Sequence, residues 1–185
     1  MLDKDTIHMK GIIPEHAELL AHGGFMEIAL RDVNAIKKWA FMEGSSGVFI
    51  NGRHGTGKSV IGQIPVIMYL EQKLPARRLA WSDLLSQVST NYNKIPNHYY
   101  FDKLIFLDDI NVYDTKAHVV ICDFIKSRLE NGVKIIIAGD MTNPMKLGEF
   151  GEFIKTSFIP ITIQGQNLRA IKVMKEKNSI YEETF

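Results

Sequence analysis

Eight residues at positions 52–59, GRHGTGKS, constrain this chain more than any other stretch. They follow a short apolar segment, GVFIN, and precede a segment of helical composition that begins at Lys58. Glycine adopts backbone conformations closed to other residues, so successive N–H groups in such a loop can turn inward and hold a chain of phosphates. The following helix adds the positive end of its dipole. The match to G-x-x-x-x-G-K-[ST] is complete and predicts a phosphate-binding loop.

We expect this loop to bind ATP or ADP together with Mg²⁺. Lys58 is predicted to reach the β- and γ-phosphates, and the Ser59 hydroxyl to help bind the metal. The predicted nucleotide-binding residues are those of the whole loop: Gly52, Arg53, His54, Gly55, Thr56, Gly57, Lys58 and Ser59. The alternative is a glycine-rich turn that matches by chance, but the preceding strand and the following helix favour phosphate binding.

An acidic pair follows the most apolar strand-like segment, LIFLDD. Mg²⁺ and an attacking water need carboxylates from a strand next to the phosphate-binding loop. Asp108 is therefore predicted to hold the metal and its water shell, and Asp109 to polarise the nucleophilic water. Two solvated aspartates at the start of a turn are the alternative interpretation.

A second buried strand, KIIIAGD, ends in Asp140. The carboxyl ends of parallel strands meet at the edge where α/β proteins bind their ligands, so polar residues there are expected near the γ-phosphate. Asp140 is the first candidate for sensing that phosphate, and Thr142 and Asn143 are the alternatives. A plain loop turn at Asn143 and Pro144 is the other interpretation.

Strand-like and helical segments alternate along the whole chain. The pattern predicts strands at 47–51, 78–81, 103–110, 133–140 and 158–165, and helices at 14–22, 25–42, 58–72, 83–90 and 117–132, with Ser82 as an N-cap and a short helix before the last strand. Such alternation is typical of a three-layer α/β sandwich with a mainly parallel, five-stranded sheet. We expect an N-terminal helical segment at 1–46, an ATPase core at 47–169 and a short tail at 170–185, with no full helical lid domain.

Composition indicates a soluble protein of the cytoplasm. The residues are 45% hydrophobic and 23% charged, which provides enough apolar material for one core, and the formal net charge of +1 does not point to a membrane or nucleic-acid partner. The single cysteine, Cys122, cannot form an internal disulfide and is expected to be buried. The sequence has no run of about 18 apolar residues, so we expect no membrane span.

The order of these motifs resembles the AAA+ ATPases, especially the DnaA and DnaC group of replication initiators and helicase loaders. The resemblance covers residues 48–169 and is carried by GRHGTGKS, SDLLSQV, LIFLDDI and RLENGVKIIIAGDMTNP. It implies a P-loop NTPase fold, ATP hydrolysis, assembly into homo- or hetero-oligomers on ATP binding, and a protein partner such as a replicative helicase.

One segment departs from the family pattern. Loaders of this type carry a serine-arginine pair after the sensor strand, and this chain has FIKTSF there, with Lys155 and Ser157. Lysine lacks the planar fork with which arginine binds two oxygens at once. The source of any arginine acting across a subunit boundary stays open, as does the role of Arg169.

Three functions follow as alternatives. The first is a helicase-loader-like ATPase that acts in DNA replication and remodels a partner or DNA. The second is a motor, either a superfamily 3-like helicase or a viral genome-packaging ATPase. The third is an adaptor that binds its partner in the ATP state with little turnover.

Single-stranded DNA is a further candidate ligand, because His98, Tyr99 and Tyr100 lie beside Lys94 and Lys103 in the sequence. Packing of this loop against the core is the alternative explanation for the same residues.

Overall fold

The structure is a computed structural model that describes residues 2–15, 30–44, 47–110, 116–140 and 148–164. The described strands are β1 (Gly47–Asn51), β2 (Ala76–Ala80), β3 (Leu104–Asp108), β4 (Lys134–Gly139) and β5 (Phe158–Thr162). The helices are α1 (Lys4–Met9), α3 (Leu30–Ala40), α4 (Lys58–Glu71), α5 (Trp81–Thr90), the 3₁₀ helix η1 (Asn97–Phe101), α6 (Lys116–Glu130) and α7 (Glu149–Ser157).

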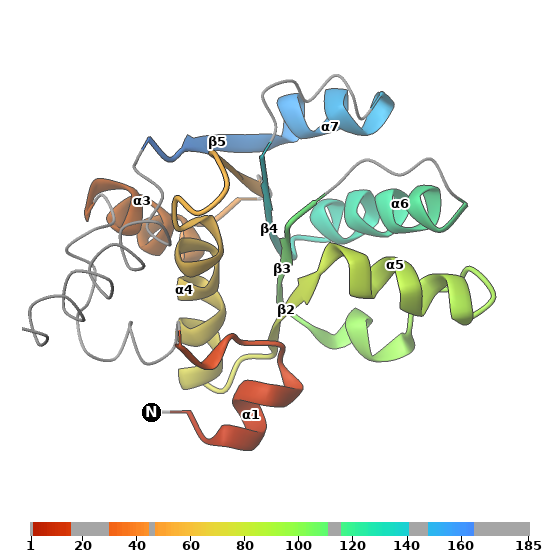
Figure 1. Ribbon diagram of the computed structural model, residues 1–185, viewed down its shortest axis with the longest axis horizontal. Helices are drawn as coiled ribbons and strands as arrows, with labels where there is room; N and C mark the ends of the chain where they lie inside the picture. The colour runs from red at the N-terminus through yellow and green to blue at the C-terminus, as the bar shows by residue number, and fades with distance from the viewer. Residues whose placement is uncertain (1, 16–29, 45–46, 111–115, 141–147, 165–185) are drawn as a thin grey trace, which may run out of the picture.

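The five strands form one sheet in the order β2-β3-β4-β1-β5, and every pairing is parallel. Helices cover both faces: α3 and α4 lie on one side, and α5, α6 and α7 on the other (Figure 1). The predicted three-layer α/β sandwich with a five-stranded parallel sheet is therefore confirmed. Strand β1 leads into the glycine loop, and β3 ends at Asp108, the first residue of the acidic pair. Both strands are neighbours of β4 in the sheet.

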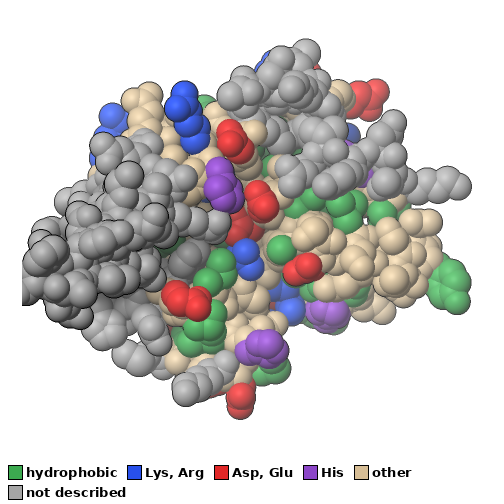
Figure 2. Space-filling model, in the orientation of Figure 1, with side chains coloured by type: hydrophobic (Ala, Val, Ile, Leu, Met, Phe, Trp, Pro, Cys, Tyr) green, Lys and Arg blue, Asp and Glu red, His purple; other side chains and the backbone are tan. Residues whose placement is uncertain are grey.

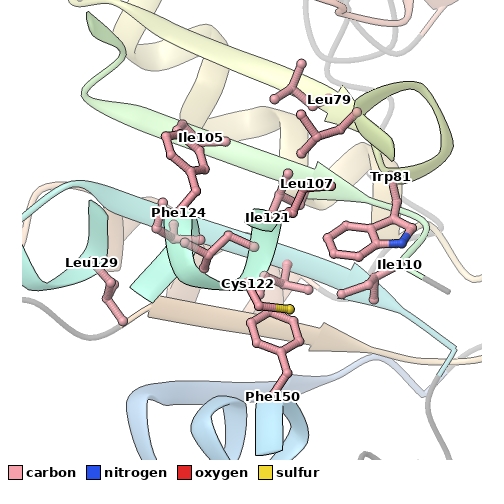
Figure 3. Close-up of a cluster of buried hydrophobic side chains, with 14 of the residues drawn as sticks. Leu79, Trp81, Ile105, Leu107, Ile110, Ile121, Cys122, Phe124, Leu129 and Phe150 are labelled. Carbon is pink, nitrogen blue, oxygen red and sulfur yellow. The ribbon is translucent and has the colours of Figure 1, made fainter. Parts of the chain in front are cut away.

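Alternation along the strands divides the core into two apolar clusters. Ile105 and Leu107 of β3 face the cluster that contains α5, α6 and α7, while Leu104 and Phe106 face the cluster that contains α3 and α4. Figure 3 shows the first cluster, in which side chains of β2 and β3 meet those of α6 and α7. Burial on both faces explains why the central strands read as uninterrupted apolar runs rather than as alternating ones.

The two edges of the sheet differ. At the β2 edge, the Arg78 amide donates to the Lys10 carbonyl over 2.9 Å, so the N-terminal segment, which we define as residues 10–13, pairs with the strand. At the β5 edge the strand contains an exposed proline, Pro160. The N-terminal segment also reaches α4, because the Ile13 amide donates to Oε1 of the fully buried Gln63 over 2.7 Å.

Some local predictions need correction. The second strand covers Ala76–Ala80 rather than 78–81, and Trp81 begins α5. Ser82 is not the N-cap: Ala80 holds that position without a side-chain hydrogen bond, because the helix follows the strand directly. The expected loop with His98, Tyr99 and Tyr100 forms the 3₁₀ helix η1. The predicted helix at 14–22 lies mostly outside the described residues.

Candidate nucleotide-binding site

The glycine loop joins the end of β1 to the start of α4. Gly55 and Gly57 have φ of 81° and 96°, the left-handed region that glycine adopts without strain, and Gly57 is the N-cap of α4. A Cβ at Gly52 would lie 2.9 Å from both the Ile163 carbonyl oxygen and Thr56 Oγ1. The loop therefore requires glycine at all three positions, with the N-terminal amides of a 14-residue helix directly behind it.

Side chains inside the loop hold its shape. The Lys58 ammonium donates to the carbonyls of Gly52 (2.7 Å) and Arg53 (2.9 Å), and the Thr56 hydroxyl donates to the same Arg53 carbonyl over 2.8 Å. Lys58 and Thr56 are buried, whereas Arg53 and His54 are exposed. The charged end of Lys58 thus lies within the curve of the loop, where an anionic ligand would enter.

The acidic end of β3 meets the start of α4. Ser59 Oγ donates to Asp108 Oδ1 over 3.0 Å, although the two residues are 49 positions apart in the chain. Asp108 is the last residue of β3 and is 2% exposed. The predicted metal-binding pair therefore comes together, with a hydroxyl and a carboxylate oxygen in contact.

Arg78 of β2 takes the other oxygen of the same carboxylate. Its Nε and Nη2 both donate to Asp108 Oδ2, over 3.0 and 2.7 Å, and its Nη1 donates to the Gly11 carbonyl over 3.1 Å. The interpretation of the sequence did not find this ion pair. The ion pair follows from the register between β2 and β3, in which Arg78 lies opposite Phe106 and Ala80 lies opposite Asp108. Arg78 is thus only two residues from the position opposite Asp108, and this proximity could have been found only from the strand pairing.

Arg77, the neighbour of Arg78, points to a different acid. Arg77 Nε donates to Oδ2 of Asp102 over 2.8 Å, and Lys10 Nζ lies 3.5 Å from Oδ1 of the same carboxylate. Alternation along β2 sends the two arginines to opposite faces. The two ion pairs are thus separate.

Asp109 and Asp140 lie at the same edge of the sheet as the loop. Asp109 is exposed and adopts a left-handed conformation with φ of 58°, and the next amide, of Ile110, donates to the Ala138 carbonyl of β4 over 2.9 Å. Asp140 is exposed and follows Gly139, which pairs with Asn51 at the end of β1. Figure 2 shows acidic side chains in the middle of the viewed face of the molecule, with Lys or Arg side chains next to them.

The remaining predicted residues fall into two groups, one outside the described residues and one on α7. Thr142, Asn143 and Arg169 lie outside the described residues. Lys155 is exposed on α7, where its ammonium lies 3.7 Å from Oε2 of Glu152, one turn away. Ser157 ends the same helix.

The aromatic loop divides between core and surface. Tyr99 is 2% exposed, and the Arg77 guanidinium lies 5.1 Å from the centre of its ring. Tyr100 is half exposed and packs edge-on against Phe124. Tyr99 is therefore packed against the core, as in the second of the two interpretations of this loop. Its burial raises the pKa of its hydroxyl. The pKa of the exposed His98 is lowered by partial desolvation and then by the positive charge of Arg77.

None of the helices in the described part of the chain has the length and apolar character needed to cross a membrane.

Sequence comparison finds no matching protein-family model and no matching curated protein. Comparison of structures does find similar folds. AMPPCP-bound DnaA from Aquifex aeolicus has a TM-score of 0.63 at 19% identity, over 80% of this chain and 50% of that one. DnaI has a TM-score of 0.61 at 13% identity, over 75% and 83%, and the DnaC helicase loader 0.57 at 13%, over 72% and 89%.

Sheet order, glycine loop and structural similarity together define a P-loop NTPase fold of the AAA+ type. More particularly, the chain has the DnaA/DnaC-like AAA+ fold. This confirms the fold implied by the sequence motifs. The chain spans about half the length of the AMPPCP-bound DnaA chains that it matches.

Proposed function

We propose that the chain binds ATP with Mg²⁺ and hydrolyses it as an AAA+-type ATPase that acts in DNA replication. The observation that carries this proposal is the contact between Ser59 Oγ and Asp108 Oδ1, at 3.0 Å. It joins the first turn of the helix behind the glycine loop to the acidic end of β3. A turn that matched the loop pattern by chance would not require an acidic strand end at that point.

The donors at this contact fit Mg²⁺. A hydroxyl and a carboxylate are the hard oxygen ligands that the ion prefers, and proteins bind it through one or two carboxylates together with the phosphates of the substrate. Ser59 and Asp108 are the residues that would hold it. When bound, the ion neutralises negative charge on the phosphate oxygens.

The remaining residues have distinct roles in the proposal. Loop amides and Lys58 bind and orient the phosphates, since Lys58 already points into the curve of the loop. Asp109, exposed just beyond Asp108, orients the attacking water and accepts its proton. Asp140 follows the strand next to β1 and is proposed to sense the γ-phosphate.

The nucleotide-binding part is tested with Lys58→Ala. A hydrogen bond to a charged group contributes about 1.5–3 kcal/mol, so the affinity for a fluorescent ATP analogue should fall by about 10- to 100-fold. Lys38→Ala, an exposed lysine on α3, is the matched control and should bind like the wild type. Thermal unfolding of each variant verifies that the loop change leaves the domain folded. No binding of ATP by the wild type would overturn the proposal.

We further propose that the partner is a replicative helicase, as for a helicase loader. The support is the fold shared with the DnaC helicase loader. Affinity capture from a lysate of the source cell, with ATP and then with ADP on the immobilised chain, tests this part. A replicative helicase retained only with ATP supports it, and no helicase in either state overturns it while the ATPase proposal stands.

One observation favours a second candidate, the ATP-dependent adaptor with little turnover. Lys155, in the segment where loaders carry an arginine, is close to Glu152 of its own helix. A purified chain that binds ATP, retains its partner and hydrolyses no ATP, with or without single-stranded DNA, would select this candidate.

A further inference from the structure

Arg78 belongs to a closed ring of contacts that includes the proposed metal-binding pair. Ser59 and Gln63 are four residues apart on α4 and therefore share one face of that helix. Ser59 contacts Asp108, Asp108 contacts Arg78, and Arg78 contacts the Gly11 carbonyl. The N-terminal segment then returns to α4 through Ile13 and Gln63.

Arg78 makes contacts through both its side chain and its backbone. Its side chain binds Asp108 and Gly11, and its own amide donates to the Lys10 carbonyl. Gly11 lies so close that a Cβ there would be 2.4 Å from the Arg78 carbonyl oxygen, at a φ of 69°. A change in how the N-terminal segment docks therefore alters the surroundings of Arg78.

The side chains of Arg78 and Asp108 are 15% and 3% exposed, so solvent screens their interaction weakly. Asp108 carries one negative charge, and Arg78 already partly neutralises it. A second cation held at Oδ1 is repelled by the guanidinium at Oδ2 and shares the same carboxylate with it. Metal binding and the Arg78 ion pair should thus weaken each other.

We propose that Arg78 is a positioning residue that couples the N-terminal segment to the magnesium-binding carboxylate, so that docking of residues 10–13 and binding of Mg²⁺ oppose each other. The inference rests on the nucleotide site proposed above. Its consequence is regulatory: a partner that lifts the N-terminal segment off β2 frees Arg78 from Gly11, loosens its hold on Asp108 and promotes Mg²⁺-dependent nucleotide binding. Coupling of this kind is reciprocal.

The test is a titration of Mg²⁺ against binding of a fluorescent ATP analogue to the full chain. In Arg78→Gln, the Mg²⁺ concentration at half-maximal binding should fall at least about fivefold. Gly11→Ala disturbs the N-terminal segment and leaves both charges in place, and it should shift the titration in the same direction. This second variant keeps the test valid if Arg78→Gln does not fold.

The matched control is Arg31→Gln, the same chemical change at an exposed arginine of α3. It leaves the contacts of the N-terminal segment with Arg78, Asp102 and Gln63 in place, and its titration should superimpose on that of the wild type. A control that shifts as far as Arg78→Gln would assign the effect to the loss of a positive charge from the chain and overturn the proposal.

Hydrogen exchange supplies a readout independent of nucleotide affinity. In the wild type, the amides of Arg78 and Ile13 should exchange faster with nucleotide and Mg²⁺ than with nucleotide and EDTA. In Arg78→Gln this difference should disappear.

The failures are distinguishable. Titrations of Arg78→Gln and Gly11→Ala that match the wild type, or a shift in Arg78→Gln alone, overturn the coupling and leave the nucleotide site intact. A wild type that binds no ATP analogue at any Mg²⁺ concentration overturns both proposals.

Discussion

The Ser59 hydroxyl donates a hydrogen bond to Asp108 Oδ1 over 3.0 Å, although the two residues lie 49 positions apart in the chain. The contact exists because β1 and β3 both pair with β4, which brings the start of α4 and the end of β3 to one edge of the sheet.

Asp108→Asn and Asp109→Asn should separate metal binding from proton transfer. Asp108→Asn removes the charge that faces Ser59, so ATP binding should lose its dependence on Mg²⁺. Asp109→Asn should bind ATP like the wild type but hydrolyse it about 10²- to 10⁴-fold more slowly, because a positioned base is lost. Binding titrations and steady-state phosphate release measure the two effects. Wild-type turnover in Asp109→Asn would contradict the proposed role.

Gly62→Ala should destabilise the domain although alanine favours helices. A Cβ at Gly62 would lie 2.3 Å from the ring of Phe106, which is fully buried in β3. Overpacking of this kind costs about 1–3 kcal/mol. Urea unfolding measures the loss, and adding Phe106→Leu should recover part of it, because a smaller side chain relieves the clash. A single variant as stable as the wild type would show that α4 and β3 are packed less closely.

Asp102→Asn should lower the free energy of unfolding by about 2–3 kcal/mol. The Asp102 carboxylate is 1% exposed and is bound by Arg77 and Lys10, so its loss leaves two positive charges without their partner. The expected cost lies below the usual range of about 3–5 kcal/mol for a broken buried pair, because both cations retain some access to water. Asp123→Asn, on the exposed face of α6, is the control and should change stability by less than about 0.5 kcal/mol. Equal losses in the two variants would contradict the prediction.

Cys122 should make stability fall at alkaline pH. Burial raises the pKa of its thiol from 9.0 to about 12, within the apolar cluster of Figure 3. Between these values the unfolded chain releases the proton and the folded chain keeps it, so stability is retained below pH 9 and lost as the pH rises. The slope is about 1.4 kcal/mol per pH unit.

Urea unfolding at pH 8, 9 and 10 should reveal this loss in the wild type relative to Cys122→Ala. Parallel pH profiles for the two proteins would show that the thiol does not titrate differently on folding.

The sequence predicted the parts of the site whose spacing is fixed by chemistry. Lys58 and Ser59 belong to one short motif, and Asp108 ends an apolar run that only a buried strand explains. The ion pair between Arg78 and Asp108 could not be predicted in the same way, because it depends on the register between β2 and β3. The roles assigned to Asp109 and Asp140 remain predictions, since both are exposed and no local pattern specifies what they bind.

Local errors have similar causes. Ser82 has the chemistry of an N-cap, but β2 passes into α5 at Ala80 and leaves no turn for a cap. Helix α1 was not predicted, although Asp3 accepts a hydrogen bond from the Thr6 amide over 2.8 Å in the spacing typical of a capped N-terminus. A six-residue helix carries too little periodic pattern to be found without that signal.

The ends of the described sheet have a consequence for self-association. An open strand edge is a template for the strands of other copies, and long exposed edges lead to aggregation. Here the N-terminal segment occupies the outer side of β2 at Arg78, and Pro160 has no amide hydrogen to offer a strand added beside β5. Copies of this chain should therefore meet through helices and loops, and their assembly should not proceed by polymerisation of the sheet.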